Sequence, residues 1–348
     1  MGRMGDARAD GRPRRHRPVA LAGVLALVLA AGLLPALPAP AEGQGIEDRI
    51  RTLGLENGRF YSHPVSSGLG AGLTSGWFHS ARALGPLEFE VGVRAVGGFV
   101  PPEDESFRPV LPQEISVPEL DGRTFADPFG TGVGLSTPTA VGEGAGIAVE
   151  PQGAFRQALL DEGLDPADFA LAFPRGFDLP AVPVGSLQLN VGVARGVEVV
   201  GRFVPRIELN EDLGAVQSVG GGLKLSVTDW LDVPTFLDLA VGGGLQSFEV
   251  GDYLTADSRH VSLMASKGFS GLTLFAAGTL ESSNVDVTYT VENPRLPEGG
   301  TTVAFEDEGE NSARFTTGFS LDILFLQLTA DYAVSDYQVV SAGLGVRF

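Results

Sequence analysis

A histidine and a serine two residues apart are the first place to look for chemistry. His260 and Ser262 lie in "RHVSLMASK", where apolar and polar residues alternate. A histidine beside a serine begins a base and nucleophile pair, but the pair also needs a carboxylate that orients the histidine. Alternation places both residues on the polar face of one strand, and the sequence places no such carboxylate beside them. We therefore predict a polar wall at this position, and we expect the chain not to be an enzyme.

Glycine-rich runs and acidic clusters are the other candidates for ligand binding. The runs "GTGVGL", "GEGAGI" and "VGGGLQ" lack the spacing of phosphate-binding loops between a strand and a helix. The clusters "PPEDES" and "FEDEGEN" lack the regular ligand spacing of a calcium loop. Cysteine is absent, which excludes thiolate ligands and disulfides. We expect no cofactor and no metal site.

Residues 1–41 are predicted to be a signal peptide. A basic segment, "RPRRHRP", precedes an apolar stretch, and Ala39 and Ala41 supply the small residues before a cleavage site at Glu42. An uncleaved N-terminal membrane anchor is the alternative. After cleavage the chain has 18 basic and 41 acidic residues, a net charge of −23. This charge argues against nucleic acid as a partner, because such binding depends on neutralising phosphates.

Period-two alternation continues from residue 86 to the end of the chain. In 326–337, for example, Leu326 and Leu328 oppose Gln327 and Thr329. Most of the segments have roughly the 9–11 residues that a tilted membrane strand needs. The segments are 87–99, 186–195, 197–208, 218–228, 236–249, 259–269, 272–291, 314–323, 326–337 and 339–348.

Alternating short turns and longer loops join these segments, which is typical of outer-membrane barrels. We therefore predict an all-β fold, an antiparallel transmembrane β-barrel of ten strands over residues 85–348. A strand in 68–79 together with a hidden one in 101–185 would make twelve. Residues 42–84, a short amphipathic helix followed by a glycine-rich stretch, form a plug or a periplasmic segment.

Residues 101–185 form one long, partly helical extracellular loop and contain 12 of the 23 prolines. The stretch "PQGAFRQALLDEGLDPADFALAFP" predicts two short helices. Their apolar side chains would make a lid at the barrel entrance or simply pack over its mouth. The lid residues are Phe155, Leu159, Leu160 and Phe169.

Charged side chains of both signs share the polar face of the strands. They have two interpretations: they line a watery pore and select solutes, or they pair across a narrow barrel and close it. The predicted lumen wall consists of Glu88, Glu90, Arg94, Glu198, Arg202, Arg206, Lys224, Asp238, Arg314, Asp322, Asp331 and Arg347.

Several stretches resemble an uncharacterised bacterial outer-membrane family, domain of unknown function 6588. They are "GLGAGLTSGWFHSARALGPLEFEVGVRAVGGFVPPEDESF", "ARGVEVVGRFVP", "TDW" and the terminal strands. The resemblance covers residues 45–348 and implies a barrel without an assigned activity. A more distant likeness to outer-membrane long-chain fatty-acid transporters rests on the plug, the helical loop and the aromatic end. The N-terminal signature and fourteen strands of those transporters are not matched.

The last strand also resembles the C-terminal signal that outer-membrane assembly machinery recognises. Leu344, Val346 and Phe348 place apolar side chains at alternate positions and an aromatic at the end. A plain edge strand is the alternative.

Together these features predict a barrel that is exported to the outer membrane. We expect it to pass or capture a small, hydrophobic molecule through a plugged lumen. The alternative is a closed structural or surface-interaction barrel without transport. The expected partners are outer-membrane lipid, the assembly machinery and, for the first function, that small hydrophobic ligand.

Overall fold

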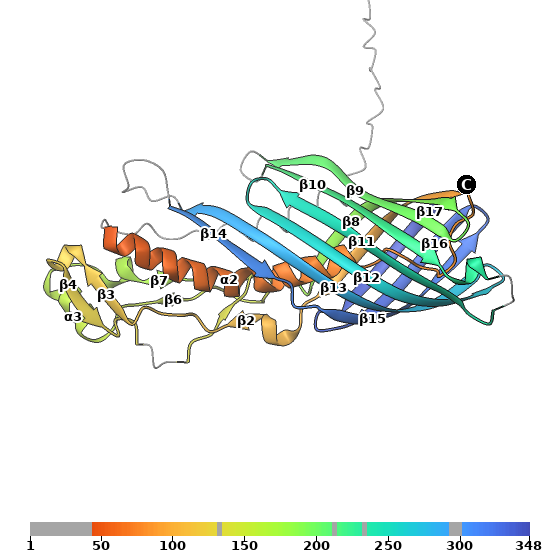
Figure 1. Ribbon diagram of the computed structural model, residues 1–348. Helices are drawn as coiled ribbons and strands as arrows, with labels where there is room; N and C mark the ends of the chain where they lie inside the picture. Colours follow the sequence, from red (N-terminus) through yellow and green to blue (C-terminus); the bar gives the residue numbers. More distant parts are fainter. Residues whose placement is uncertain (1–43, 131–133, 211–213, 232–234, 292–300) are drawn as a thin grey trace, which may run out of the picture.

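Ten strands form one closed antiparallel barrel in the computed structural model, which describes residues 44–130, 134–210, 214–231, 235–291 and 301–348 (Figure 1). The ring closes where β1 pairs with both β8 and β17, and where β12 pairs with β13. The prediction of ten strands is confirmed, and twelve is wrong. The barrel strands are β1 (Phe89–Phe99), β8 (Ala181–Ala194), β9 (Val197–Asn210), β10 (Gly214–Ser226), β11 (Asp238–Val250), β12 (Leu254–Phe269), β13 (Leu272–Val291), β15 (Ala313–Ile323), β16 (Leu326–Val334) and β17 (Val339–Arg347).

The two faces of the barrel wall differ in polarity, and the difference reverses along the strands. Around the middle of the barrel, Val261 and Leu263 are exposed on the outside, whereas His260 and Ser262 are buried inside. The long connection between β1 and β8 leaves the barrel at one end, the long-loop end. Towards this end, Leu254 and Ala256 of β12 are buried and face inward. An apolar belt therefore surrounds a polar interior, and beyond the belt the interior becomes apolar.

A long helix, α2 (Gln44–Thr74), enters this apolar interior from beyond the long-loop end (Figure 1). Leu69 and Leu73 are fully buried in one cluster with inward residues of the surrounding strands. The predictions of a short helix and of a strand in 68–79 are wrong, because residues 44–74 form one helix. Within the described ranges, no helix is both long and apolar enough to cross a membrane.

Close contact with the wall explains why glycines occur in the second half of α2. A Cβ on Gly68 would lie 2.6 Å from Cγ2 of Val182, and one on Gly72 would lie 2.6 Å from Cγ2 of Val184. Side chains at these positions would push the helix away from the barrel wall. Pro64 lies inside the same helix, where proline is unfavourable by about 3 kcal/mol, so tertiary packing outweighs local propensity here.

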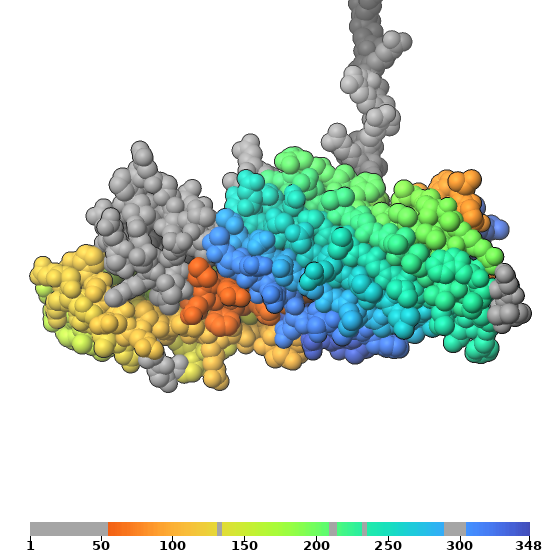
Figure 2. All heavy atoms as spheres, viewed as in Figure 1, coloured from red at the N-terminus to blue at the C-terminus, as the bar shows by residue number. Residues whose placement is uncertain are grey.

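Residues 100–130 and 134–180 form an outer lobe at one end of the barrel (Figures 1 and 2). This lobe has its own hydrophobic core, which includes Phe125, Phe129 and Phe155. The first predicted helix is confirmed as α3, and the second is a short 3-10 helix, η3. The strand β14 extends the β13 edge beyond the barrel. The bounds of these elements are β2 (Ser106–Phe107), β3 (Glu114–Val117), β4 (Arg123–Ala126), β5 (Thr137–Pro138), β6 (Ala148–Val149), α3 (Gly153–Asp161), η3 (Pro166–Phe169), β7 (Leu171–Ala172) and β14 (Thr301–Glu308).

Candidate functional site: the filled lumen of the barrel

The C-terminal end of α2 lies inside the barrel and is bound by two arginines of the wall. Arg202 donates from Nη1 to the carbonyl oxygen of Ser75 at 2.8 Å. Arg314 donates from Nη2 to the carbonyl oxygen of Thr74 at 2.6 Å. The last carbonyls of a helix lack partners within the helix and carry partial negative charge. Since α2 has no basic residue in its last turn, the wall supplies both the donors and the positive charge.

Two aromatic rings fill the lumen directly after the helix. Trp77 and Phe78 are 2% and 8% exposed. The guanidinium of Arg202 lies 4.3 Å from the Trp77 ring centroid, and the Trp77 Nε1 donates to the Leu73 carbonyl oxygen at 2.9 Å. A Cβ on Gly222 would lie 2.9 Å from the indole ring. Glycines on the inner face therefore make room for these rings.

The segment from residue 75 to residue 86 continues through the lumen, and wall side chains bind its backbone. Ser266 Oγ accepts from the backbone N–H of Ala81 at 3.0 Å, and Glu198 Oε2 accepts from that of Leu84 at 3.0 Å. Gln188 donates from Nε2 to the carbonyl oxygen of Trp77 at 3.1 Å. Buried backbone groups need such partners, and here the wall provides what a regular element would otherwise supply.

Oppositely charged side chains pair in the same interior. Lys224 Nζ lies 2.9 Å from a carboxylate oxygen of Glu198, and Arg94 Nη2 lies 3.0 Å from one of Glu90. Arg314 is paired with Glu281. Nε2 of His79, in the segment after α2, lies 3.3 Å from Asp331, and this ring carries a charge only when it is protonated. These side chains are buried. A buried charge is costly without its partner, so the three ion pairs compensate the charges of the wall, and the His79 contact joins the segment after α2 to it.

The space that remains in this network is small. A cavity of about 30 Å³ lies between Trp77, Phe78, His260, Arg314 and Asp331. That volume suits about one water molecule. This cavity is therefore too small to hold a solute larger than water.

The structure places most of the predicted lumen-wall residues inside the barrel. The buried ones are Glu90, Arg94, Glu198, Arg202, Lys224, Arg314 and Asp331. Three others, Asp238, Asp322 and Arg347, are half-buried near the opposite, short-turn end. Thus the alternation that identifies strands also identifies their inner faces.

Two of the predicted wall residues are exposed instead. Glu88 precedes β1 and accepts from the backbone N–H of Gly85 at 2.9 Å. Arg206 lies 3.0 Å from Glu208 near the long-loop end of β9. The pairing register between β9 and β10 shifts between Val204 and Ile207, an interval that contains Arg206. A bulge of this kind breaks the alternation, which is why the parity of the sequence assigned Arg206 to the wrong face.

The predicted lumen wall left out several polar residues of the interior. Gln188 and Asn190 are buried and bonded to each other at 2.8 Å, and Asn190 also donates to Glu198. Glu281, the partner of Arg314, is buried on β13. Their parity along the strands would have found them, because they alternate with exposed apolar residues. The capping of α2 by the wall has no such local signal.

The candidate His260 and Ser262 do not form a nucleophile and base pair. The Ser262 hydroxyl is hydrogen-bonded to that of Thr279 at 2.8 Å. The His260 ring packs on Trp77, with 5.0 Å between the ring centroids. Among the residues with assigned positions, no three metal-ligating side chains converge. Both residues belong to the packed wall.

A second histidine lies between two carboxylates above the belt. His63 of α2 lies 3.1 Å from Asp307 of β14 and 3.3 Å from Glu310. The hydrogen bond with Asp307 raises the pKa of His63 to about 9. Its ring is therefore protonated at neutral pH and cannot serve as a base for Ser67, whose hydroxyl lies 3.5 Å from it. The acidic cluster "FEDEGEN" thus holds α2 against β14.

The predicted lid residues lie in the outer lobe. Phe155 and Leu159 of α3 are buried in the core of that lobe, Phe169 packs against it, and Leu160 is half exposed. Figure 1 shows α3 at the end of the molecule remote from the barrel. Their apolar side chains stabilise the lobe, so a lid made from them does not follow from this arrangement.

The closing strand pairs with the first strand at the short-turn end. Leu344 and Phe348 are exposed on the outside, and Val346 is half-buried. The backbone N–H of Phe348 donates to the Phe89 carbonyl oxygen at 2.9 Å. The two rings are stacked, with 5.1 Å between their centroids.

Solved structures with some likeness to the chain are bacterial outer-membrane proteins. Ail, the attachment invasion locus protein of Yersinia pestis, in complex with the heparin analogue sucrose octasulfate, is 8% identical over 76% of this chain and 99% of its own, with a TM-score of 0.25. LpxR from Salmonella typhimurium is 10% identical over 47% and 71%, with a TM-score of 0.26. The N-terminal barrel domain of Pseudomonas aeruginosa OprF is 12% identical over 44% and 96%, with a TM-score of 0.22.

TM-scores of this size do not indicate a shared fold, so the barrel is established by its own strand pairings. No curated protein matches the chain. None of these three proteins is a long-chain fatty-acid transporter by its title, so that distant likeness stays a prediction. A family model matches residues 24–348, which is nearly the whole chain. The chain belongs to the family of unknown function DUF6588.

Proposed function

We propose that this protein is an outer-membrane barrel with a closed lumen, which holds a lobe outside the cell for surface interactions. The observation that carries the proposal is the filled interior, where α2 and the segment after it leave a cavity of about 30 Å³. A wall of ten strands is little wider than the eight-stranded barrels that side chains fill. Here chain segments fill the extra width.

The reversal of polarity along the strands supports placement in a membrane. An outward apolar belt with a polar interior is the pattern of a barrel in lipid. Beyond the belt, outward positions of β13 become polar at Asn284 and Asp286, while Val285 and Val287 are buried around α2. That is the pattern of a structure surrounded by water. The strands therefore extend out of the membrane at the long-loop end.

Orientation follows from the connections. In outer-membrane barrels the short turns face the periplasm and the long loops face outward. The lobe of residues 100–180 and the first half of α2 then lie outside the cell. The predicted signal peptide, residues 1–41, lies outside the described residues and stays a prediction, as does recognition of Leu344, Val346 and Phe348 by assembly machinery.

The charge of the outer lobe restricts its partners. Residues 101–180 contain 14 acidic residues and four arginines, a net charge of −10. Such a field repels polyanions. A partner of the lobe is therefore expected to be neutral or positively charged.

Gated passage of a small hydrophobic molecule is the second candidate. It is favoured by the polar contacts between wall and plug segment, such as those of Ser266 and Glu198, because water can replace such contacts if the segment moves. This function would require movement of the segment after α2, or of α2 itself.

A disulfide between α2 and the wall separates the two candidates. The chain has no cysteine, and a Cβ on Gly72 would lie 3.3 Å from Cβ of Val184, close to disulfide geometry. The double variant Gly72→Cys/Val184→Cys is reconstituted in planar bilayers, oxidised and reduced, beside each single variant. A closed barrel conducts in neither state. Conductance of wild type and of the reduced double variant, which oxidation of the variant abolishes, would establish gated passage and refute the closed lumen.

A further inference from the structure

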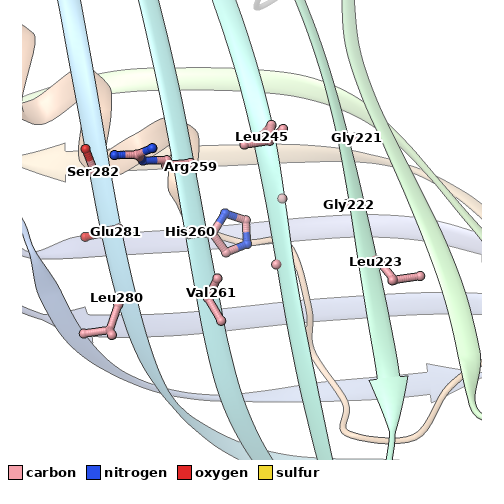
Figure 3. A pocket seen from close by; sticks show the side chains of 12 residues that line it. Gly221, Gly222, Leu223, Leu245, Arg259, His260, Val261, Leu280, Glu281 and Ser282 are labelled. Atoms are coloured by element: carbon pink, nitrogen blue, oxygen red, sulfur yellow. The ribbon is translucent and has the colours of Figure 1, made fainter.

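The outer face of the barrel carries a groove across four strands, within the apolar belt. The groove has a volume of about 830 Å³ and runs over β10, β11, β12 and β13 (Figure 3). Its sides are formed by exposed Leu223, Leu245, Val261 and Leu280. The described chain leaves these side chains without cover.

Two outward glycines make the floor of the groove. Gly221 is paired with Leu245, and Gly243 is paired with Leu223, so each glycine lies beside a leucine on the next strand. Backbone is thus exposed between raised apolar side chains. The inner packing does not demand glycine at position 221, because a Cβ there would meet nothing within 4 Å. The hollow is open space on the lipid side, and Gly221 keeps it open.

A positive charge lies at the end of the groove nearer the long loops. Arg259 is paired with Leu245 on one side and Ser282 on the other, and Figure 3 shows its guanidinium extending toward Ser282. Its side chain is exposed and makes no hydrogen bond or ion pair with any other residue that the structure describes. Toward the long-loop end the next outward residue of its strand is Asp257, and Thr255 follows.

The height of Arg259 on the barrel fits the boundary of a membrane. Lys267 faces outward on the same strand eight residues away, about 26 Å along the strand at ~3.3 Å per residue. With a tilt of ~40°, this is roughly 20 Å across the membrane, close to the ~25 Å of an apolar belt. Arg259 therefore lies at headgroup level, and the groove below it lies at the level of acyl chains.

We propose that the groove binds one acyl chain of a phosphate-bearing lipid of the outward leaflet, with its phosphate at Arg259. The inference rests on the membrane placement in the proposed function. An acyl chain in the hollow would contact the exposed backbone of Gly221 and the four apolar side chains. The guanidinium would donate charge-assisted hydrogen bonds to the phosphate, with Ser282 as a second donor.

We test this by comparing lipid binding to purified wild type with binding to variants in which a new side chain fills the groove. Gly221→Leu places a side chain in the hollow. Gly201→Leu is the matched control, because Gly201 is the partner of Gly221 on β9, is equally open and does not line the groove. Arg259→Gln removes the charge alone. Phosphatidylglycerol and phosphatidylcholine with identical acyl chains are titrated into detergent solutions, and bound lipid is counted by native mass spectrometry.

Wild type and Gly201→Leu should retain one phosphatidylglycerol in preference to phosphatidylcholine. Gly221→Leu should lose both lipids, and Arg259→Gln should bind phosphatidylglycerol about tenfold more weakly, the effect of one charge-assisted hydrogen bond. Inorganic phosphate should not displace phosphatidylglycerol, because it has no acyl chain to occupy the groove. If Gly221→Leu retained as much phosphatidylglycerol as wild type, this inference would be overturned, and the proposed function would stand. A wild-type barrel that fails to enter bilayers would overturn the proposed function, and this inference with it.

Discussion

Replacing Trp77 by alanine is the most direct test of the packed interior. The indole is 2% exposed and lies between the Arg202 guanidinium and the glycines of β10 and β11. The chain has one other tryptophan, Trp230, which is 49% exposed at the short-turn end and donates to the carbonyl oxygen of Arg195 at 2.7 Å. Trp230→Ala is therefore a control of the same chemistry outside the lumen.

The expected losses differ severalfold. Truncating a buried tryptophan lowers the free energy of unfolding by about 3–5 kcal/mol. The cation–π contact with Arg202 adds ~2 kcal/mol when desolvated, and the hydrogen bond to Leu73 adds about 1 kcal/mol. Water entering the new space would solvate Arg202, whose Nη2 has no partner now, and recover part of this. We expect a net loss of about 4 kcal/mol for Trp77→Ala and about 1 kcal/mol for Trp230→Ala.

Denaturant unfolding of both variants in lipid vesicles measures these losses. Far-UV circular dichroism follows the strands, and fluorescence of the remaining tryptophan reports on the site that each variant leaves intact. Should Trp77→Ala lose less than about 1 kcal/mol, or no more than Trp230→Ala, the lumen would not be packed as described.

Three further predictions concern the charges and the orientation. Glu198→Gln should lose about 3–5 kcal/mol in the same unfolding assay, because Lys224 becomes an unpaired buried charge, and Glu198→Gln/Lys224→Met should recover most of it. The pKa of His63 is raised to about 9, so the stabilisation that protonated His63 contributes should be full below pH 6.5 and vanish as pH rises past 9. The unfolding temperatures of wild type and His63→Gln should therefore converge above pH 9. A difference that stays constant with pH would contradict this prediction. An impermeant maleimide should label Arg59→Cys but not Ser270→Cys on intact cells, and the reverse would invert the orientation.

Strand positions and inner faces follow from the sequence because alternation is a local property. Leu326 and Gln327 face opposite sides in any strand, whatever lies beside it. The same rule found Arg94, Glu198 and Asp331 as interior residues. It failed at Arg206, where a register shift between β9 and β10 changes the face, and no local pattern marks such a shift.

The helix α2 shows where local reasoning fails. Pro64 and the glycines at 68, 70 and 72 predict a turn or a strand, because both residue types disfavour helix interiors. In the structure those glycines let the helix touch the wall, and Arg202 and Arg314, distant in sequence, bind its last carbonyls. Contacts between distant segments decided the conformation of this one.

The sequence by itself determined that the chain is a barrel of about ten strands with a polar interior and an apolar outer belt, because these features follow from the period-two pattern; the choice of ten over twelve needed the strand pairings. Only the tertiary structure decided how the polar interior is filled. Whether charges of both signs line a pore or pair across it depends on distances, such as the 2.9 Å between Lys224 and Glu198, that no pattern within one strand contains. The role of a glycine also depends on what faces it. Gly222 makes room for the Trp77 ring, whereas Gly221 faces open space.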